Sequence, residues 1–92
     1  MTDVIPGRPE LAAGVRLHWD KVRERHVLLF PEGALVLSPT AVAVLELCDG
    51  RRSIDDIAME ISAQYAGADV RADVEGLLGA IAQRGLVFDA DA

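Results

Sequence analysis

Cysteine and aromatic residues are scarce in this chain of 92 residues, which holds one Cys, one Trp, one Tyr and two Phe. A single cysteine, Cys48, excludes an internal disulfide framework and any zinc or iron–sulfur site built from several cysteines. No apolar run is long enough to cross a bilayer, and the N-terminal segment lacks the pattern of a signal peptide. These absences predict a soluble protein with a cytoplasmic location and no membrane contact.

Length and composition favour a single folded domain. Hydrophobic residues make up 51% of the chain, and the shortage of aromatics means that the core must be aliphatic. A chain of this length buries roughly 60–65% of its unfolded surface, which is enough for one modest core. Residues 1–10 contain two prolines and a glycine without periodicity, so we expect a flexible N-terminal arm there and one domain over residues 11–90.

The negative charge is concentrated in the C-terminal two-thirds of the chain. The formal net charge is -6. Residues 1–31 carry five bases and four acids, a net of +1, whereas residues 32–92 carry four bases and eleven acids, a net of -7. Nucleic-acid binding depends on neutralising phosphates, so this distribution argues against a nucleic-acid partner.

Residues 15–37 have the pattern of three short strands. Apolar and polar residues alternate over residues 15–20, a second apolar run covers residues 26–30, and a third covers residues 34–37. Pro31-Glu32-Gly33 is typical of a turn between the last two runs. The pattern predicts a three-stranded antiparallel meander with the second run in the centre.

The expected turns also predict which side chains share a face of this sheet. If Trp19 pairs with Arg25 and Phe30 with Ala34, one face is apolar and forms the core. That face would hold Val15, Leu17, Val27, Leu29, Leu35 and Leu37, with Trp19 at its rim. The reverse face would hold Arg16, His18, His26, Leu28, Phe30, Ala34 and Val36.

After Leu37 the periodicity becomes helical. Ser38-Pro39 is a helix start and Asp49-Gly50 a helix end, while Ser53 and Asp69 are expected to cap a second and a third helix. The third helix ends at Arg84-Gly85, and residues 86–88 form a short strand or a plug over the core. The predicted fold class is therefore α+β, a three-stranded meander followed by a three-helix bundle in the order βββααα.

No catalytic constellation is found, so we expect neither an enzyme nor a bound cofactor. In the predicted register His18 and His26 face each other, but two ligands without a nearby carboxylate make a weak metal site, and two solvated histidines are the simpler interpretation. Cys48 lies in an apolar helix and is expected to be a small buried hydrophobe. Trp19 either stacks on Arg25 or only closes the edge of the core.

The third strand is predicted to leave one backbone edge unpaired. Residues 34–37 contain no charge, proline or bulge that would protect such an edge. Either a peptide adds there as a further strand, or the protein's own helices or a second copy cover it, which would make a homodimer. Backbone hydrogen bonds alone supply too little free energy for micromolar binding, so a peptide would also need the apolar side chains of the third helix.

Three segments follow one another in a characteristic order: His26-Val27-Leu28-Leu29-Phe30-Pro31-Glu32-Gly33, the helix start at Leu37-Ser38, and Asp49-Gly50 before the second helix. In order and spacing they resemble the PqqD family, the small peptide chaperones of pyrroloquinoline quinone biosynthesis. The resemblance extends from about Pro9 to Phe88.

The resemblance implies a winged-helix-like domain that binds the precursor peptide PqqA and presents it to PqqE, a radical S-adenosylmethionine enzyme that carries the iron–sulfur clusters. It implies that the peptide adds as a strand beside the third helix. The implied peptide-binding residues are Ala34, Leu35, Val36, Leu37, Val70, Arg71, Val74, Leu77, Leu78 and Ile81. Candidates for docking on the enzyme are Arg16, Lys21, Arg23, Arg25, Leu28 and Phe30.

Two other functions are compatible with the same fold. One is leader-peptide recognition in another pathway that modifies ribosomally made peptides. The other is a winged-helix nucleic-acid-binding protein, against which the acids Asp69, Asp73 and Glu75 near the start of the third helix argue.

Overall fold

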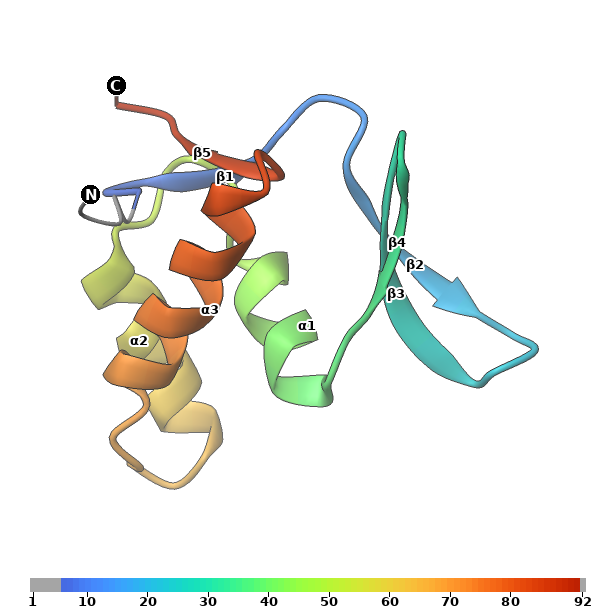
Figure 1. Ribbon diagram of the computed structural model, residues 1–92. Coiled ribbons are helices and arrows are strands. Elements are labelled where there is room, and N and C mark those ends of the chain that lie inside the picture. Colours follow the sequence, from blue (N-terminus) through green and yellow to red (C-terminus); the bar gives the residue numbers. More distant parts are fainter. Residues whose placement is uncertain (1–5, 92) are drawn as a thin grey trace.

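The computed structural model describes residues 6–91 and contains two small sheets and three helices. The elements are β1 (Pro9–Leu11), β2 (Arg16–Asp20), β3 (Arg25–Phe30), β4 (Gly33–Val36), α1 (Pro39–Glu46), α2 (Ile54–Gln64), α3 (Arg71–Gln83) and β5 (Val87–Asp89). The antiparallel sheet β2-β3-β4 lies on one side of α1, and α2 and α3 lie on the other (Figure 1). The predicted mixed α+β fold, with a three-stranded meander and three helices, is confirmed.

The two ends of the described chain pair with each other. β1 runs antiparallel to β5, with Pro9 opposite Asp89 and Leu11 opposite Val87. The predicted flexible arm over residues 1–10 is therefore wrong for Pro9 and Glu10, and its residues 1–5 lie outside the described residues. Three residues are too few to show alternation, so only the folded chain reveals this strand.

Polar contacts around Asp89 and Gly50 stabilise the β1–β5 pair. The Asp89 carboxylate accepts hydrogen bonds from the backbone N–H groups of Asp91 (2.9 Å) and Arg8 (3.2 Å). Together with Gly7, these donors lower the pKa of Asp89 below its usual value. Gly50 has φ +79 and donates to the Pro9 carbonyl at 3.0 Å; a Cβ there would lie 2.5 Å from a Glu10 carboxylate oxygen. The positive φ therefore favours glycine at this position.

The register of the main sheet differs by one residue from the predicted one in both hairpins. Asp20 pairs with Arg25, and Phe30 pairs with Gly33. Both turns are one residue shorter than expected. In the first hairpin Asp20 belongs to β2, and its carboxylate accepts hydrogen bonds from the Val22 and Arg23 N–H groups of the turn. In the second, Gly33 has extended backbone (φ 159) and belongs to β4 rather than to the turn. The run Val27-Leu28-Leu29 is apolar at every position, so alternation could not show which residue points inward.

The corrected register reverses the faces assigned to several side chains. Leu17, Leu28 and Leu35 now form one row across the sheet, on the face that packs against the core. Val27 and Leu29 are on the reverse face, where Val27 is nevertheless buried. The predicted core face is thus correct for Val15, Leu17, Leu35 and Leu37 but wrong for Val27 and Leu29; it also omitted Leu28 and Phe30.

The two histidines do not face each other. His18 is opposite Val27, whereas His26 is opposite Trp19, so the histidine side chains are on opposite faces of the sheet. The predicted His18–His26 pair is therefore wrong. Trp19 packs edge-on against the His26 ring with centroids 4.9 Å apart, and Arg25 lies opposite Asp20, so the expected pairing of Trp19 with Arg25 is wrong as well.

The helices begin largely where their capping residues predict. Ser38 accepts a hydrogen bond from the Ala41 N–H, and Ser53 forms a reciprocal capping box with Asp56. The third helix differs, because its N-cap residue is Val70, which has no side-chain cap; Asp69, one residue earlier, accepts a hydrogen bond from the Arg71 N–H at 3.3 Å. Among residues 6–91, no helix has the length and apolarity needed to cross a membrane.

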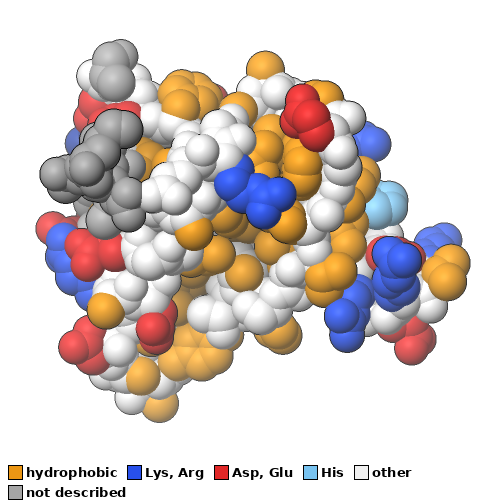
Figure 2. Space-filling view, viewed as in Figure 1, with side chains coloured by type: hydrophobic (Ala, Val, Ile, Leu, Met, Phe, Trp, Pro, Cys, Tyr) orange, Lys and Arg blue, Asp and Glu red, His pale blue; other side chains and the backbone are white. Residues whose placement is uncertain are grey.

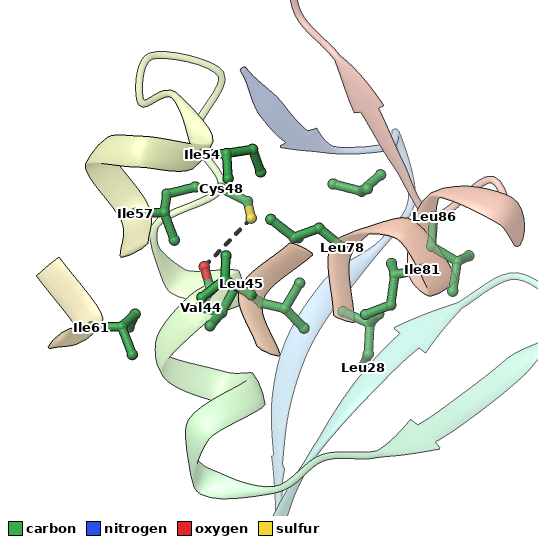
Figure 3. Packing of buried hydrophobic residues seen from close by; sticks show 12 residues of the cluster. Leu28, Val44, Leu45, Cys48, Ile54, Ile57, Ile61, Leu78, Ile81 and Leu86 are labelled. Carbon is green, nitrogen blue, oxygen red and sulfur yellow. Dashed lines mark hydrogen bonds between the residues drawn. The ribbon is translucent and has the colours of Figure 1, made fainter. Parts of the chain in front are cut away.

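The core joins the sheet to all three helices through aliphatic side chains. Leu28 from β3 lies beside Ile81 and Leu86, while Ile54, Ile57 and Leu45 pack around Cys48 (Figure 3). The Cys48 thiol donates to the Val44 carbonyl at 3.4 Å. No polar or charged side chain is buried among the described residues. The core is therefore held by hydrophobic burial alone.

The register can be tested by truncating two neighbouring leucines. Leu28 is 0% exposed at the centre of the core, whereas Leu29 is partly buried on the reverse face. We expect Leu28→Ala to lower the free energy of unfolding by about 2–5 kcal/mol and Leu29→Ala by less than about 2 kcal/mol. Urea unfolding of both variants measures the difference; a larger loss for Leu29→Ala would contradict the register.

The Cys48 thiol should be unreactive in the folded protein. Burial raises its pKa to about 12, with a smaller contribution from the Asp49 carboxylate. Since the thiolate is the reacting form, alkylation at pH 8 should be about a thousandfold slower than for a thiol of ordinary pKa. Iodoacetamide labelling followed by mass spectrometry, with and without denaturant, measures this. Rapid labelling of the native protein would contradict the burial of Cys48.

Candidate functional site

One edge of the main sheet is open. β4 pairs only with β3, and within residues 6–91 no strand lies against its other side. The Leu37 N–H donates to the His26 carbonyl at 3.0 Å, which marks this pair as hydrogen-bonded. Hydrogen-bonded and non-bonded pairs alternate along an antiparallel ladder, so Leu35 also bonds to β3. Ala34 and Val36 therefore direct their N–H and C=O groups outward.

The side chains of this edge are apolar and accessible. Ala34 and Val36 are exposed, with 54% of Val36 in contact with solvent. Leu35 and Leu37 are partly buried against the core and hold the strand in place. β4 has no charge, proline or bulge to protect its edge, as the sequence predicts.

The other wall of the site is formed by one face of α3. Residues at helical spacings of four, three and four lie along this face: Asp73, Leu77 and Ala80 in α3, and Arg84 at its C-cap. Near its start, α3 borders a hollow of about 300 Å³, which is also lined by Ser38, Thr40, Ala41, Val44, Val70 and Val74. At its far end the Arg84 guanidinium lies 5.9 Å from the Phe30 ring centroid.

These contacts place the two ends of the α3 face near the two ends of β4. Asp73 and Leu77 share a hollow with Ser38, two residues after the end of β4, and Arg84 reaches Phe30, which pairs with the first residue of β4. Figure 2 shows hydrophobic side chains gathered across the middle of this face of the molecule, between the helices and the sheet. We call the space bounded by β4 and the α3 face the edge groove.

The structure brings together only part of the predicted peptide-binding set. Ala34 and Val36 lie at the open edge; Val70 and Leu77 are partly buried at the wall, and Val74, 1% exposed, lines the hollow between them. The remaining predicted residues are the following: Leu35, Leu37, Arg71, Leu78 and Ile81.

Three of those residues do not face the groove. Leu78 and Ile81 are buried in the core, so their predicted contact with a peptide is wrong. Arg71 is directed toward α2, where it forms ion pairs with Asp55 and with Glu75, so its predicted place in the groove is wrong too. A helix of mixed apolar and polar residues does not reveal from sequence alone which neighbour each side meets.

Sequence reasoning missed the polar members of the wall. Asp73 and Arg84 are exposed charged residues, and Ala80 is an exposed small residue between Leu77 and Arg84. Their helical spacing shows from the sequence that they share one face of the helix. Only the position of β4 shows that this face borders the open strand edge. Arg84 was predicted only as the end of the helix.

The predicted enzyme-docking residues divide into two groups. Arg16, Lys21, Arg23 and Arg25 are exposed on the β2–β3 hairpin, where Arg23 pairs with Asp20 at 3.5 Å. Leu28 is fully buried, so its predicted docking role is wrong, and Phe30 is partly buried against the core. A second hollow of about 620 Å³ lies beside the turn end of the hairpin, lined in part by Trp19, Glu24 and His26.

No metal centre is formed by the part of the chain that the structure describes. Within residues 6–91, no three His, Cys, Asp or Glu side chains lie close enough to hold an ion. What the geometry offers is an unpaired strand edge beside an apolar wall that carries one charge near each end. An unpaired strand edge is the feature to which an extended peptide adds in strand-addition complexes.

Comparisons with known proteins identify the family of this chain. Residues 25–87 match the family model described as coenzyme PQQ synthesis protein D (PqqD). The chain is 33% identical over 78 residues to the PqqA binding protein of Methylococcus capsulatus, covering 85% of this chain and 84% of that one. It is 44% identical over 78 residues to the bifunctional coenzyme PQQ synthesis protein C/D of Methylorubrum extorquens, covering 83% of this chain but 21% of that longer protein.

A solved structure extends the similarity to the fold. The solution structure of the PqqD truncation of Methylobacterium extorquens PqqCD, described as a stand-alone recognition element for ribosomally synthesised and post-translationally modified peptides, matches with a TM-score of 0.77. Sequence identity is 38%, and the match covers 92% of this chain and 95% of that one. The chain therefore belongs to the PqqD family.

Proposed function

We propose that this protein is a non-catalytic peptide chaperone of pyrroloquinoline quinone biosynthesis. It binds the precursor peptide PqqA as an added strand on β4 and presents it to the radical enzyme PqqE. The names of its relatives support PqqA as the ligand. The observation that carries the proposal is the outward-facing backbone of Ala34 and Val36 beside the α3 wall.

The free energies explain why the groove needs both walls. Ala34 and Val36 offer two N–H and two C=O groups, whose hydrogen bonds would contribute roughly 2–6 kcal/mol. Micromolar affinity needs about 8 kcal/mol. Burying about 100 Å² of apolar surface on Val36 and Leu77 would add about 2.5 kcal/mol. Backbone hydrogen bonds determine where the peptide binds on the sheet, and burial of apolar side chains contributes the remaining binding free energy.

The edge-strand site predicts a specific effect of proline. Val36→Pro removes an outward N–H without disturbing the bonds between β4 and β3, so PqqA should bind about tenfold more weakly while the fold is retained. Titration calorimetry with synthetic PqqA measures the affinity, and circular dichroism checks the fold.

Two further variants make this test decisive. Val36→Ala keeps the N–H and shortens only the side chain, so it should lose less affinity than Val36→Pro. Ala34→Pro removes the other outward donor and should resemble Val36→Pro. Unchanged PqqA affinity in both folded proline variants would overturn the site.

Presentation to PqqE is assigned to the β2–β3 hairpin. Its bases Arg16, Lys21, Arg23 and Arg25 form an exposed positive group on a chain of net charge -6. The tip also exposes Val22, which is 94% accessible. The hairpin projects away from the helices (Figure 1), so an enzyme could contact it while the edge groove holds the peptide.

Charge reversal at the hairpin should separate enzyme docking from peptide binding. Lys21→Glu/Arg23→Glu should weaken the complex with PqqE severalfold at low salt and leave PqqA affinity unchanged, because the reversal removes two of the positive charges that we assign to the enzyme contact. Arg51→Glu, a charge reversal away from the hairpin, is the matched control. Surface plasmon resonance against immobilised PqqE measures both; equal binding by the double variant and the control would assign docking to another surface.

The same strand edge is also compatible with other ligands. A free backbone edge pairs with any extended chain, so the same groove could receive the leader of another ribosomally made peptide or the β4 strand of a second copy. Titration of PqqA against unrelated leader peptides distinguishes the first case. Analytical ultracentrifugation of the protein with and without PqqA distinguishes the second, since dimerisation through β4 and peptide binding would exclude each other.

A further inference from the structure

The α3 wall carries opposite charges near its two ends. Asp73 borders the hollow at the start of α3, and Arg84 lies over the Phe30 ring at its end. Within residues 6–91, neither side chain takes part in an ion pair, in contrast to Arg71 on the same helix, which pairs with both Asp55 and Glu75. Both charges are exposed, so both remain available to a ligand in the groove.

The two charges match opposite ends of β4. Arg84 lies by Phe30, which pairs with Gly33 at the start of the strand. Asp73 shares its hollow with Ser38, which follows the end of the strand. Antiparallel pairing is the commoner arrangement of strands, and an antiparallel peptide on β4 would begin near Asp73 and end near Arg84.

The separation of the charges sets a spacing for the peptide. Eleven residues of helix rise about 16.5 Å, which an extended chain covers in about five residues. Side chains on one face of a strand are separated by an even number of residues, so partners for both charges would be four or six residues apart. The arginine side chain is long enough to absorb the difference.

We propose that Asp73 and Arg84 read the direction and register of the bound peptide. The preferred ligand carries a Lys or Arg that faces Asp73 and, four or six residues later, an Asp or Glu that faces Arg84. A peptide in the opposite direction, or shifted by one residue, would bring like charges together or direct its charges away from α3. Backbone bonds cannot fix the register, because every residue supplies the same groups. The inference rests on the proposed function and names the residues that give it specificity.

Exchanging the two charges tests the inference at constant net charge. In Asp73→Arg/Arg84→Asp both ion pairs become repulsive, so synthetic PqqA should bind about tenfold more weakly at low salt, and the loss should shrink as salt is raised. A PqqA peptide whose acidic and basic residues are exchanged should show the reverse preference and bind the variant better than the wild type. Glu60→Arg/Arg51→Glu makes a comparable exchange outside the groove and should leave both affinities unchanged.

The possible outcomes distinguish the role of Asp73 and Arg84 from the proposed peptide site on β4. If Val36→Pro weakens PqqA binding while Asp73→Arg/Arg84→Asp leaves both peptides bound as by the wild type, the groove is real and the charge reading is wrong. If neither variant changes PqqA binding, the edge groove is not the site and both proposals fail. Loss of affinity with PqqA and recovery with the charge-exchanged peptide is the result that the geometry predicts.

Discussion

The hydrogen-bond ladder between β3 and β4 determines what this protein offers to a partner. Because Leu35 and Leu37 use their backbone groups on β3, the alternation of the ladder leaves those of Ala34 and Val36 facing outward. The same two leucines point their side chains into the core, so the strand is anchored by its inward residues and open through its outward ones. A shift of one residue would bury the edge side chains and expose the core.

The rest of the fold supports this edge without covering it. Leu28 packs the sheet against Ile81 of α3 and against Leu86, which follows that helix. The β1–β5 pair holds the two ends of the chain together on the helical side, away from the groove (Figure 1). The core contains no buried polar side chain within residues 6–91, so the polar groups that matter for recognition are on the surface.

Local chemistry was predictable from sequence, and long-range geometry was not. Ser38-Pro39 and Ser53 cap their helices as expected, because capping depends on a few adjacent residues. The open edge of the third strand was expected from the composition of residues 34–37, which is also a local property. The register was not, because Val27, Leu28 and Leu29 are interchangeable by hydrophobicity. β1 pairs with β5, about 80 residues later in the sequence, and the Arg71 side chain is directed toward α2. Neither contact can be predicted from the residues next to it in the sequence.

Backbone amide hydrogen exchange, followed residue by residue by NMR, tests the central claim most directly. In the free protein the Leu35 and Leu37 amides should exchange slowly and the Ala34 and Val36 amides quickly, because only the first two are bonded to β3. Addition of PqqA should slow exchange at Ala34 and Val36 and leave Leu35 nearly unchanged. Protection of Ala34 and Val36 in the free monomer, or fast exchange at both when PqqA is bound, would contradict the account.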